Sequence, residues 1–359
     1  MTRKRILIAP LDWGLGHAAR CVPIIQELLA KELDVVIAAD NRPAELLKKE
    51  FPDLEHVRFP GYTIDYPVNA NMAWTMFRQL PKLYRGIGEE HANLETLVRV
   101  HRIDAVISDN RWGAYSTTVP SIYIVHQLRI LLSRLLRWGQ PIVDLANGRL
   151  IRPFSEVWIP DRGTEDRLSG ELSHDSLLPK NSFFIGPLSR LKRIDTFKKE
   201  LDILVILSGP EPQRTIFEKL ITEQLKQTTM RALVVRGTPE RMLKMKLSET
   251  LTLVSALTAS ELSEAIAASH IIISRPGYST VMDLAVLGAN AIFVPTPQQT
   301  EQEYLAKRLK KQKICYSETQ EEFSLTRAVA QFNSYSGFTQ QPNDLNVLRQ
   351  RIDHLITRI

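Results

Sequence analysis

The sequence predicts an α/β fold built from two doubly wound parallel-sheet domains. Short apolar runs rich in β-branched residues alternate with longer stretches of helical period, which is typical of parallel βαβ units with helices on both faces. This alternation runs through the first half of the chain and starts again in the second half. With 359 residues, the chain is also too long for one ordinary core, since domains commonly contain about 100 to 200 residues.

The predicted strands form two series. The first comprises residues 5–10, 34–39, 105–108 and 121–125, and the second comprises residues 203–208, 232–236, 271–274 and 291–295. Between them, residues 183–188 read FFIGPL, whose glycine and proline break any regular element.

These series define the expected domains. We predict a Rossmann-like N-terminal domain over residues 1–188 and a Rossmann-like C-terminal domain over residues 189–340. Residues 341–359 carry leucine and isoleucine at steps of three or four, so we expect a helix that packs back on the N-terminal domain. The two domains should face each other across a cleft, because ligands of such sheets bind beyond the carboxyl ends of the strands.

Composition excludes several classes of protein. The hydrophobic fraction of 44% and the charged fraction of 24% are those of an ordinary globular chain. No apolar run approaches the roughly 18 to 20 residues that a membrane span requires. Cys21 and Cys315 lack the spacing of a disulfide framework or a zinc site, which favours a cytoplasmic location. The net charge of +6 favours an acidic partner, but no nucleic-acid-binding module is present.

The first motif follows the first predicted strand. Residues 12–20 read DWGLGHAAR and enter a helical pattern. Gly14 and Gly16 let the backbone approach a ligand, and a helix N-terminus offers unpaired N–H groups. Because that terminus disfavours imidazolium, His17 should stay neutral and act as a general base. The same pattern also fits a capping or core histidine on a nucleotide-type turn.

The second motif spans residues 273–283, which read ISRPGYSTVMD. It predicts a strand, a glycine turn and a helix that carries a carboxylate. Gly277 and the backbone N–H groups of Ser279 and Thr280 could cradle a diphosphate, and Asp283 could accept hydrogen bonds from ribose hydroxyls. A carboxylate near a helix N-terminus is also favoured by the helix dipole alone.

Together these residues resemble the MurG-like GT-B glycosyltransferases, whose C-terminal domain is of the glycosyltransferase family 28 type. That family carries R-x-G-x-x-T-x-x-E, then a glycine and a V-P strand end. Arg275, Gly277, Thr280, Gly288 and Pro295 match this pattern, while Asp283 stands where the family usually has glutamate. Gly14, Gly16 and His17 resemble the glycine-rich N-terminal loop of the same family.

The resemblance implies a UDP-sugar site. The residues expected to hold the donor are Gly14, Gly16, Ser208, Gly209, Leu257, Arg275, Gly277, Ser279, Thr280, Asp283, Gln298, Gln302 and Glu303. Within this set, the loop at Ser208 and Gly209 is expected at the phosphates, Leu257 at the uracil, and Gln302 and Glu303 at the sugar. No D-x-D motif occurs in the chain, so we expect no metal and no cofactor, with the leaving-group charge met by Arg275 and the helix N-terminus.

The expected enzyme is therefore an inverting UDP-dependent hexosyl- or N-acetylhexosaminyl-transferase with His17 as its base and a lipid-linked or saccharide acceptor. Two alternatives stay open. The string GLGHAARC, residues 14–21, also resembles UDP-sugar hydrolases of the pseudaminic acid pathway, in which the histidine activates water. A non-catalytic UDP-sugar-binding subunit is the other alternative.

A basic segment predicts a surface for the acceptor. Residues 126–154 interleave leucines and Trp138 with arginines, which are Arg129, Arg134, Arg137, Arg149 and Arg152, against one acid, Asp144. Such a segment fits an anionic membrane surface, so we expect peripheral attachment at the cytoplasmic face, with residues 73–87 as an extension. The alternatives are a helix packed on the sheet with a solvated basic face, and a dimer interface.

Overall fold

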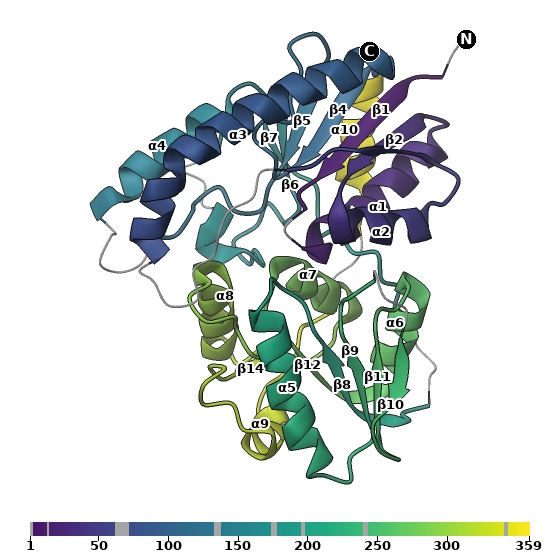
Figure 1. The fold of residues 1–359 in the computed structure, drawn as a ribbon, viewed down its shortest axis with the longest axis vertical. Helices are drawn as coiled ribbons and strands as arrows, with labels where there is room; N and C mark the ends of the chain where they lie inside the picture. The colour runs from purple at the N-terminus through teal and green to yellow at the C-terminus, as the bar shows by residue number, and fades with distance from the viewer. Residues whose placement is uncertain are drawn as a thin grey trace. The chain divides into compact units, whose positions relative to one another are not determined.

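The computed structural model describes residues 3–12, 14–61, 72–132, 138–173, 178–194, 198–239, 243–340 and 344–359, and of residues 72–80 the backbone alone. The chain divides into two compact units (Figure 1). The first unit comprises Met1–Asp12, Cys21–Gly186 and Leu345–Ile359, and the second comprises Trp13–Arg20 and Pro187–Asp344. Among the described helices, none combines the length and the apolarity that crossing a membrane requires.

The first unit is built on a seven-stranded sheet in the order β3-β2-β1-β4-β5-β6-β7. Every neighbouring pair of these strands is parallel. The strands are β1 (Arg5–Pro10), β2 (Asp34–Ala39), β3 (Glu55–Arg58), β4 (Ala105–Asp109), β5 (Ser121–Ile124), β6 (Glu156–Ile159) and β7 (Ser182–Phe184). The central strands are buried on both faces, as expected of a parallel sheet covered by helices.

Helices cover this sheet (Figure 1). They are α1 (Leu15–Ala30), α2 (Asn41–Glu50), α3 (Met72–Val100), α4 (Gln140–Ile151), the short 3₁₀ helix η2 (Gly170–Ser173) and the terminal α10 (Asn346–Ile356). Helix α10 buries Leu348, Ile352 and Leu355. Its polar side is tied to the same unit by ion pairs, including Arg349 with Glu27 at 2.8 Å.

The second unit is built on a seven-stranded sheet in the order β10-β11-β9-β8-β12-β13-β14, in which only the β10–β11 pair is antiparallel among the described strands. The strands are β8 (Leu201–Ile206), β9 (Ala232–Val235), β10 (Lys244–Lys246), β11 (Leu251–Val254), β12 (Ser269–Ser274), β13 (Ile292–Phe293) and β14 (Tyr316–Ser317). The helices are α5 (Gln213–Lys226), α6 (Ala259–Ala267), α7 (Tyr278–Leu287), α8 (Thr300–Lys311) and α9 (Leu325–Phe332).

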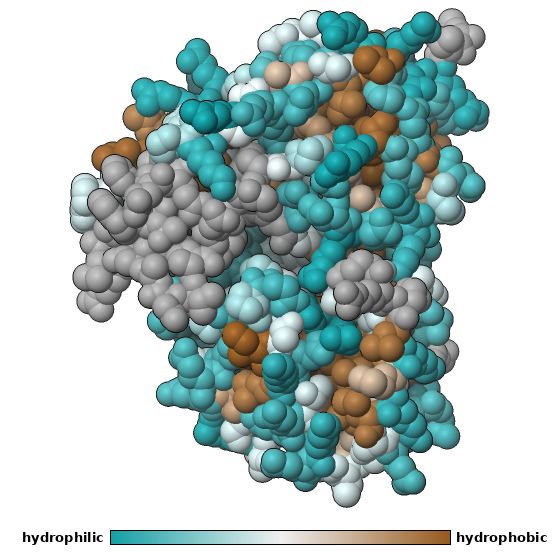
Figure 2. Space-filling model, in the orientation of Figure 1, coloured by the Kyte–Doolittle hydropathy of each residue, from teal (hydrophilic) through white to brown (hydrophobic). Residues whose placement is uncertain are grey.

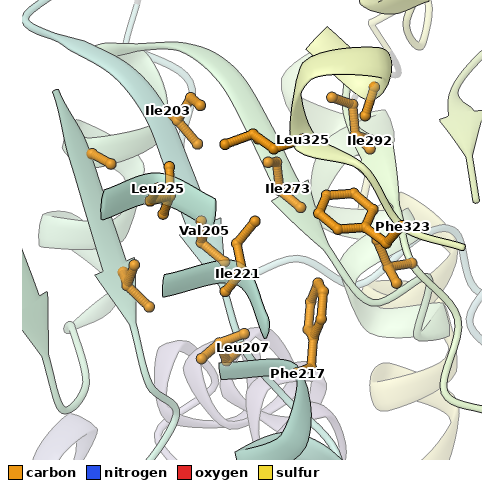
Figure 3. Packing of buried hydrophobic residues seen from close by; sticks show 14 of the residues in the cluster. Ile203, Val205, Leu207, Phe217, Ile221, Leu225, Ile273, Ile292, Phe323 and Leu325 are labelled. Carbon is orange, nitrogen blue, oxygen red and sulfur yellow. The ribbon is translucent and has the colours of Figure 1, made fainter. Parts of the chain in front are cut away.

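The core of the second unit lies between this sheet and helices α5 and α9. Figure 3 shows Phe217 and Ile221 of α5 packed over Val205 and Ile273 of neighbouring strands. The ring of Phe217 meets that of Phe323 edge-on, with centroids 6.0 Å apart. Burial of this apolar surface stabilises the unit and fixes the strand ends from which the site loops leave.

The predicted α/β class with two doubly wound sheets is confirmed. The strands β1 and β2 have the predicted bounds, whereas β8 begins and ends two residues earlier than expected. Leu207 still pairs with Val235, but Gly209 turns the chain with a φ of 101°, so Ser208 belongs to the loop. The segment 183–188 was expected to be irregular, yet its first two residues complete the edge strand β7 before Gly186.

Candidate functional site

The candidate site lies at the carboxyl edge of the second sheet. The order of the strands reverses between β8 and β12, since the chain continues from β8 to β9 on one side and from β12 to β13 on the other. Loops that leave two such strands diverge and open a crevice, where ligands of doubly wound sheets bind. The loop with Ser208 and Gly209 and the turn with Gly277 flank this position.

Helix α7 presents an N-terminus without a side-chain cap. Gly277 is the N-cap residue, and no side chain accepts a hydrogen bond from the first turn there. A Cβ atom built on Gly277 would meet no atom within 4 Å, so there is room beside the turn. The helix is anchored by buried Tyr278, Val281 and Met282. The first-turn N–H groups of a helix lack intrahelical partners, so those of Ser279 and Thr280 can bind an anion without moving the helix.

The two glycine motifs meet within the second unit. Ser279 Oγ donates a 2.9 Å hydrogen bond to the carbonyl oxygen of Gly16. A Cβ atom on Gly16 would lie 2.8 Å from that same Oγ, so a larger residue there would force Ser279 to shift. On Gly14 an added Cβ would meet nothing within 4 Å. The glycine-rich turn at the start of α1 and the N-terminus of α7 therefore form one surface.

His17 lies in the first turn of α1, where Arg20 contacts it. Arg20 Nη2 lies 3.0 Å from His17 Nδ1, and Arg20 is buried. A guanidinium can only donate, so Nδ1 accepts, and the neutral ring carries its proton on Nε2. In that tautomer the ring offers an N–H group rather than a lone pair at Nε2. The general-base role expected from the sequence would require this contact to open.

Asp283 has a partner that the sequence did not suggest. Ser189 Oγ donates a 2.5 Å hydrogen bond to Asp283 Oδ1. Burial raises the pKa of Asp283 to about 6, and the Ser189 hydrogen bond and the charge of Arg190 only partly oppose that shift. Asp283, the residue expected at the ribose, is half-buried one turn into α7. Its carboxyl group already accepts the hydrogen bond from Ser189.

Arg275 is fully buried and is bound by carbonyl groups rather than by acids. Its guanidinium donates to the carbonyl oxygens of Val294 and Pro295, each at 2.9 Å, and to that of Gln213 at 3.2 Å. The same group stacks 4.3 Å from the centre of the Phe217 ring. Desolvation lowers the pKa of Arg275 to about 9. These contacts join the loops after β12 and β13 to the start of α5, which is a positioning role.

The predicted sugar-binding residues follow β13. Gln302 is buried, and its Oε1 accepts a 2.8 Å hydrogen bond from the backbone N–H of Thr296. Glu303 is exposed, and its Oε1 accepts from the backbone N–H of Gln298 at 2.9 Å. Gln302 therefore shapes the loop, while Glu303 and Gln298 lie at its surface.

Two polar groups at this edge were missed from the sequence. Thr296 Oγ1 and Gln299 Oε1 are buried, and neither has a hydrogen-bond partner in the described part of the chain. A Cβ built on Gly209 would lie 3.8 Å from Thr296 Oγ1, so the loops after β8 and β13 approach each other. Buried hydroxyl groups are nearly always bonded, so an orphaned one at a crevice indicates a ligand. The sequence gives one indication of this site: Thr296 stands between two prolines, whose lack of N–H groups leaves few backbone partners for its hydroxyl group.

Leu257 lies apart from this group, because β11 and β8 are separated by β9 in the sheet. It is half-buried and precedes α6, whose start is closed by a capping box between Thr258 and Glu261. The position suits a backbone contact to a base at the far end of a nucleotide. Across the described residues, no group of three or more histidine, cysteine or acidic side chains is arranged to hold a metal ion.

Comparison with known proteins shows which family the second unit resembles. Residues 204–351 match the glycosyltransferase family 28 C-terminal domain, a range that leaves out the turn at the start of α1 and the segment of Ser189. The chain is similar to MurG-like glycosyltransferases and has the GT-B fold. An uncharacterised glycosyltransferase of Methanosarcina acetivorans is 23% identical over 322 residues, 83% of this chain and 79% of the relative.

A second relative carries a specific activity. It is the UDP-N-acetylglucosamine–N-acetylmuramyl-(pentapeptide) pyrophosphoryl-undecaprenol N-acetylglucosamine transferase of Methylobacterium nodulans, 25% identical over 320 residues, 84% of this chain and 79% of that one. Both matches extend well beyond the C-terminal domain.

Solved structures share the fold. MurG of Acinetobacter baumannii has a TM-score of 0.56 at 16% identity over the full length of both chains. The glycosyltransferase of kitacinnamycin has a TM-score of 0.61 at 14% identity, covering 100% of this MurG-like chain and 95% of its own. A putative UDP-N-acetylglucosamine 2-epimerase from Listeria monocytogenes has a TM-score of 0.60 at 12% identity, covering 98% and 95%. The shared fold alone therefore does not select the reaction.

Proposed function

We propose that this MurG-like protein transfers a sugar from a UDP-sugar to a lipid-linked acceptor with inversion and without a metal ion. The observation that carries the proposal is the uncapped N-terminus of α7 at the crevice between β8 and β12, with open space beside Gly277. A helix N-terminus in that setting favours a diphosphate. The transferred sugar is a hexose or an N-acetylhexosamine, as in the relative that uses UDP-N-acetylglucosamine.

In the proposed reaction, the acceptor oxygen bonds to the anomeric carbon as the bond from that carbon to the diphosphate breaks. The electron pair leaves with UDP, and the acceptor proton passes to water. The N–H groups at Ser279 and Thr280 lie where the charge on the diphosphate grows, and such fixed donors stabilise a transition state. Asp283 is proposed at the ribose and the loop of Glu303 at the sugar.

The acceptor proposal rests on an unusual face of α4. Two of its three buried positions are polar: Gln140 donates to the carbonyl of Ile130 at 2.9 Å, and Asn147 donates to that of Leu128 at 2.8 Å. The outward positions Ile142 and Leu145 of α4 are apolar and exposed by 66% and 57%, and Trp138, two residues before the helix, is exposed by 78%. Figure 2 shows hydrophobic residues on the outer surface where Figure 1 places α4.

The exposed apolar residues on α4 are followed along the helix by two arginines. Arg149 and Arg152 are exposed and follow Leu145 at steps of four and three, which lie on one helix face. An apolar stripe that ends in arginines fits a bilayer surface with anionic headgroups. Residues 133–137, with Arg134 and Arg137, lie outside the described residues, and the side chains predicted to contribute at 73–80 do as well.

Donor consumption tests the proposal. The purified protein is incubated with a panel of UDP-sugars, with EDTA, and with or without a membrane lipid extract. We expect UDP release that depends on lipid and persists in EDTA. Equal release without lipid would identify hydrolysis by water. Binding of UDP-sugar without release under any condition would identify a non-catalytic subunit. The variant Asp283→Asn should weaken donor use, whereas Ser189→Ala should not.

A further inference from the structure

We infer that Arg20 is a positioning residue that fixes His17 as a hydrogen-bond donor, with its proton on Nε2, rather than as a general base. The observation is the contact of 3.0 Å between Arg20 Nη2 and His17 Nδ1. Arginine has no lone pair to offer at neutral pH, so the shared hydrogen belongs to Arg20. The lone pair of Nδ1 is therefore occupied.

The position of Arg20 makes this contact persistent. Arg20 is 2% exposed although it carries a charge, and its separation of three residues from His17 places both side chains on one face of α1. The positive ends of the backbone dipoles also gather in this first turn, so a second positive charge on His17 would be repelled from two sides. The arrangement favours the neutral ring and one tautomer of it.

A base role would need the reverse arrangement. A histidine that accepts a proton at Nε2 carries its first proton on Nδ1, where an acceptor such as a carboxylate or a carbonyl orients it. Arg20 supplies a donor at that nitrogen. With the observed contact intact, Nε2 has no lone pair with which to accept a proton from a sugar, a lipid or water.

The Nε2–H group of His17 could donate a hydrogen bond to a ligand at the N-terminus of α7. Gly16, the residue before His17, accepts a hydrogen bond from Ser279 in the first turn of α7. His17 is thus one residue from the proposed diphosphate site. A donated hydrogen bond from Nε2 to a phosphate oxygen of the leaving UDP would grow stronger as negative charge develops there. This last step rests on the proposed transfer, whereas the tautomer does not.

The tautomer can be measured without any substrate. Protein labelled with ¹⁵N-histidine is recorded in long-range ¹H–¹⁵N correlation spectra near pH 7.5, where protonated and unprotonated ring nitrogens resonate far apart. The chain has eight histidines, and the signal lost in His17→Gln assigns residue 17. We expect hydrogen on Nε2 and a lone pair on Nδ1. Hydrogen on Nδ1 in the unaltered protein would overturn the inference at once.

Variants of Arg20 test the cause. Arg20→Lys keeps a donor and should keep the tautomer, while Arg20→Met should populate the Nδ1–H form. A matched control exists on α10, where Arg351 Nη2 lies 2.8 Å from His354 Nδ1 with the same spacing of three residues. Arg351→Met should leave the His17 signals unchanged. An unchanged tautomer in a folded Arg20→Met protein would show that Arg20 does not set it.

Kinetic measurements then show whether His17 acts as a hydrogen-bond donor or as a general base. The amide nitrogen of glutamine lies close to the place of Nε2, whereas that of asparagine lies close to Nδ1. We expect His17→Gln to keep kcat within about 10-fold, and both His17→Asn and His17→Ala to lose about 100-fold or more. Equal loss in all three, with the Nε2–H tautomer established by the spectra, would leave the role of Arg20 intact and remove the proposed bond to UDP.

Discussion

The hydroxyl group of Ser189 donates a hydrogen bond of 2.5 Å to the carboxyl group of Asp283, which lies 94 residues later in the chain. Ser189 belongs to the segment that enters the second unit, and it also accepts a hydrogen bond from the backbone N–H of Leu191 at 3.1 Å. Asp283 is therefore held from outside its own helix. Its environment, more than its place in the motif, sets its protonation.

Asp283 should make stability depend on pH in a direction opposite to most acids. Its pKa is about 6 in the folded protein and 3.8 ordinarily, so the folded state binds this proton more tightly than the unfolded chain. The contribution is complete below about pH 4 and is lost as pH rises through about 6. Asp283→Asn should remove this slope and raise the free energy of unfolding at pH 7 by about 1 to 2 kcal/mol.

Urea unfolding of both proteins between pH 4.5 and 7.5 measures this slope. Ser189→Ala serves as the partner variant, since it removes the hydrogen bond while the carboxyl group stays. If the difference between the unaltered protein and Asp283→Asn were constant over that range, the Asp283 carboxyl group would not be the source.

Gly16 should be required for steric reasons, because a methyl group there would lie 2.8 Å from Ser279 Oγ. Gly16→Ala should lower the free energy of unfolding by about 1 to 3 kcal/mol. Gly14→Ala is the matched control, since nothing lies within 4 Å of its Cβ position. Adding Ser279→Gly to Gly16→Ala should recover most of the loss, which a double-mutant cycle on thermal unfolding would reveal. Independent effects of the two substitutions would contradict the contact.

Sequence predicts the fold of this chain well where strands are buried on both faces. After a charged first residue, the strands β1 and β2 are continuous apolar runs, which mark most of their length. The edge strand β3 reads EHVR and is half-exposed, so no apolar run marks it. Strand β14 is two residues long and depends on its neighbour for its existence.

The site is predicted less completely, and the reason is physical. Glycine turns indicate where the backbone can approach a ligand, so Gly16 and Gly277 are predicted from the sequence alone. The partners of charged side chains depend on tertiary packing, so neither Ser189 beside Asp283 nor the carbonyl groups around Arg275 could be read from spacing. Arg275 was expected at the leaving group and is instead bound to the loops behind it.

Thr296 should bind the donor without supporting the fold. Its buried Oγ1 has no partner within the described residues, so replacement by the isosteric valine removes a desolvated group and loses no bond. We expect Thr296→Val to be as stable as the unaltered protein or more stable by up to about 1 kcal/mol. Its KM for the UDP-sugar should rise by about 5- to 10-fold, since a hydrogen bond contributes about 1 kcal/mol. A stable variant with an unchanged KM would exclude Thr296 from the site.

Arg275 should act mainly on stability. Its guanidinium donates to three backbone carbonyls and stacks on Phe217, and lysine cannot reproduce that planar fork. Arg275→Lys should lower the free energy of unfolding by about 2 to 4 kcal/mol, because it leaves buried carbonyl groups unpaired. Phe217→Leu should cost less, as it keeps the hydrogen bonds. Urea titrations compare the two, and the reverse order of destabilisation would show that ring stacking dominates.

The exposed face of α4 should bind anionic lipid. Replacing Trp138, Ile142 and Leu145 together with serine removes apolar side chains that are mostly exposed, so the fold should persist while vesicle binding falls by about 10-fold or more. Ile216 on α5 is also exposed, by 41%, and Ile216→Ser is therefore the matched control. Sedimentation with vesicles of anionic and of zwitterionic phospholipid measures the vesicle binding of both variants.

Binding should also weaken as salt is added, because salt screens the attraction of Arg149 and Arg152 to the lipid charge. Unchanged vesicle binding by the triple variant would assign the lipid contact to another surface. If the unaltered protein self-associates and the triple variant does not, the face is instead an interface between two copies of the chain.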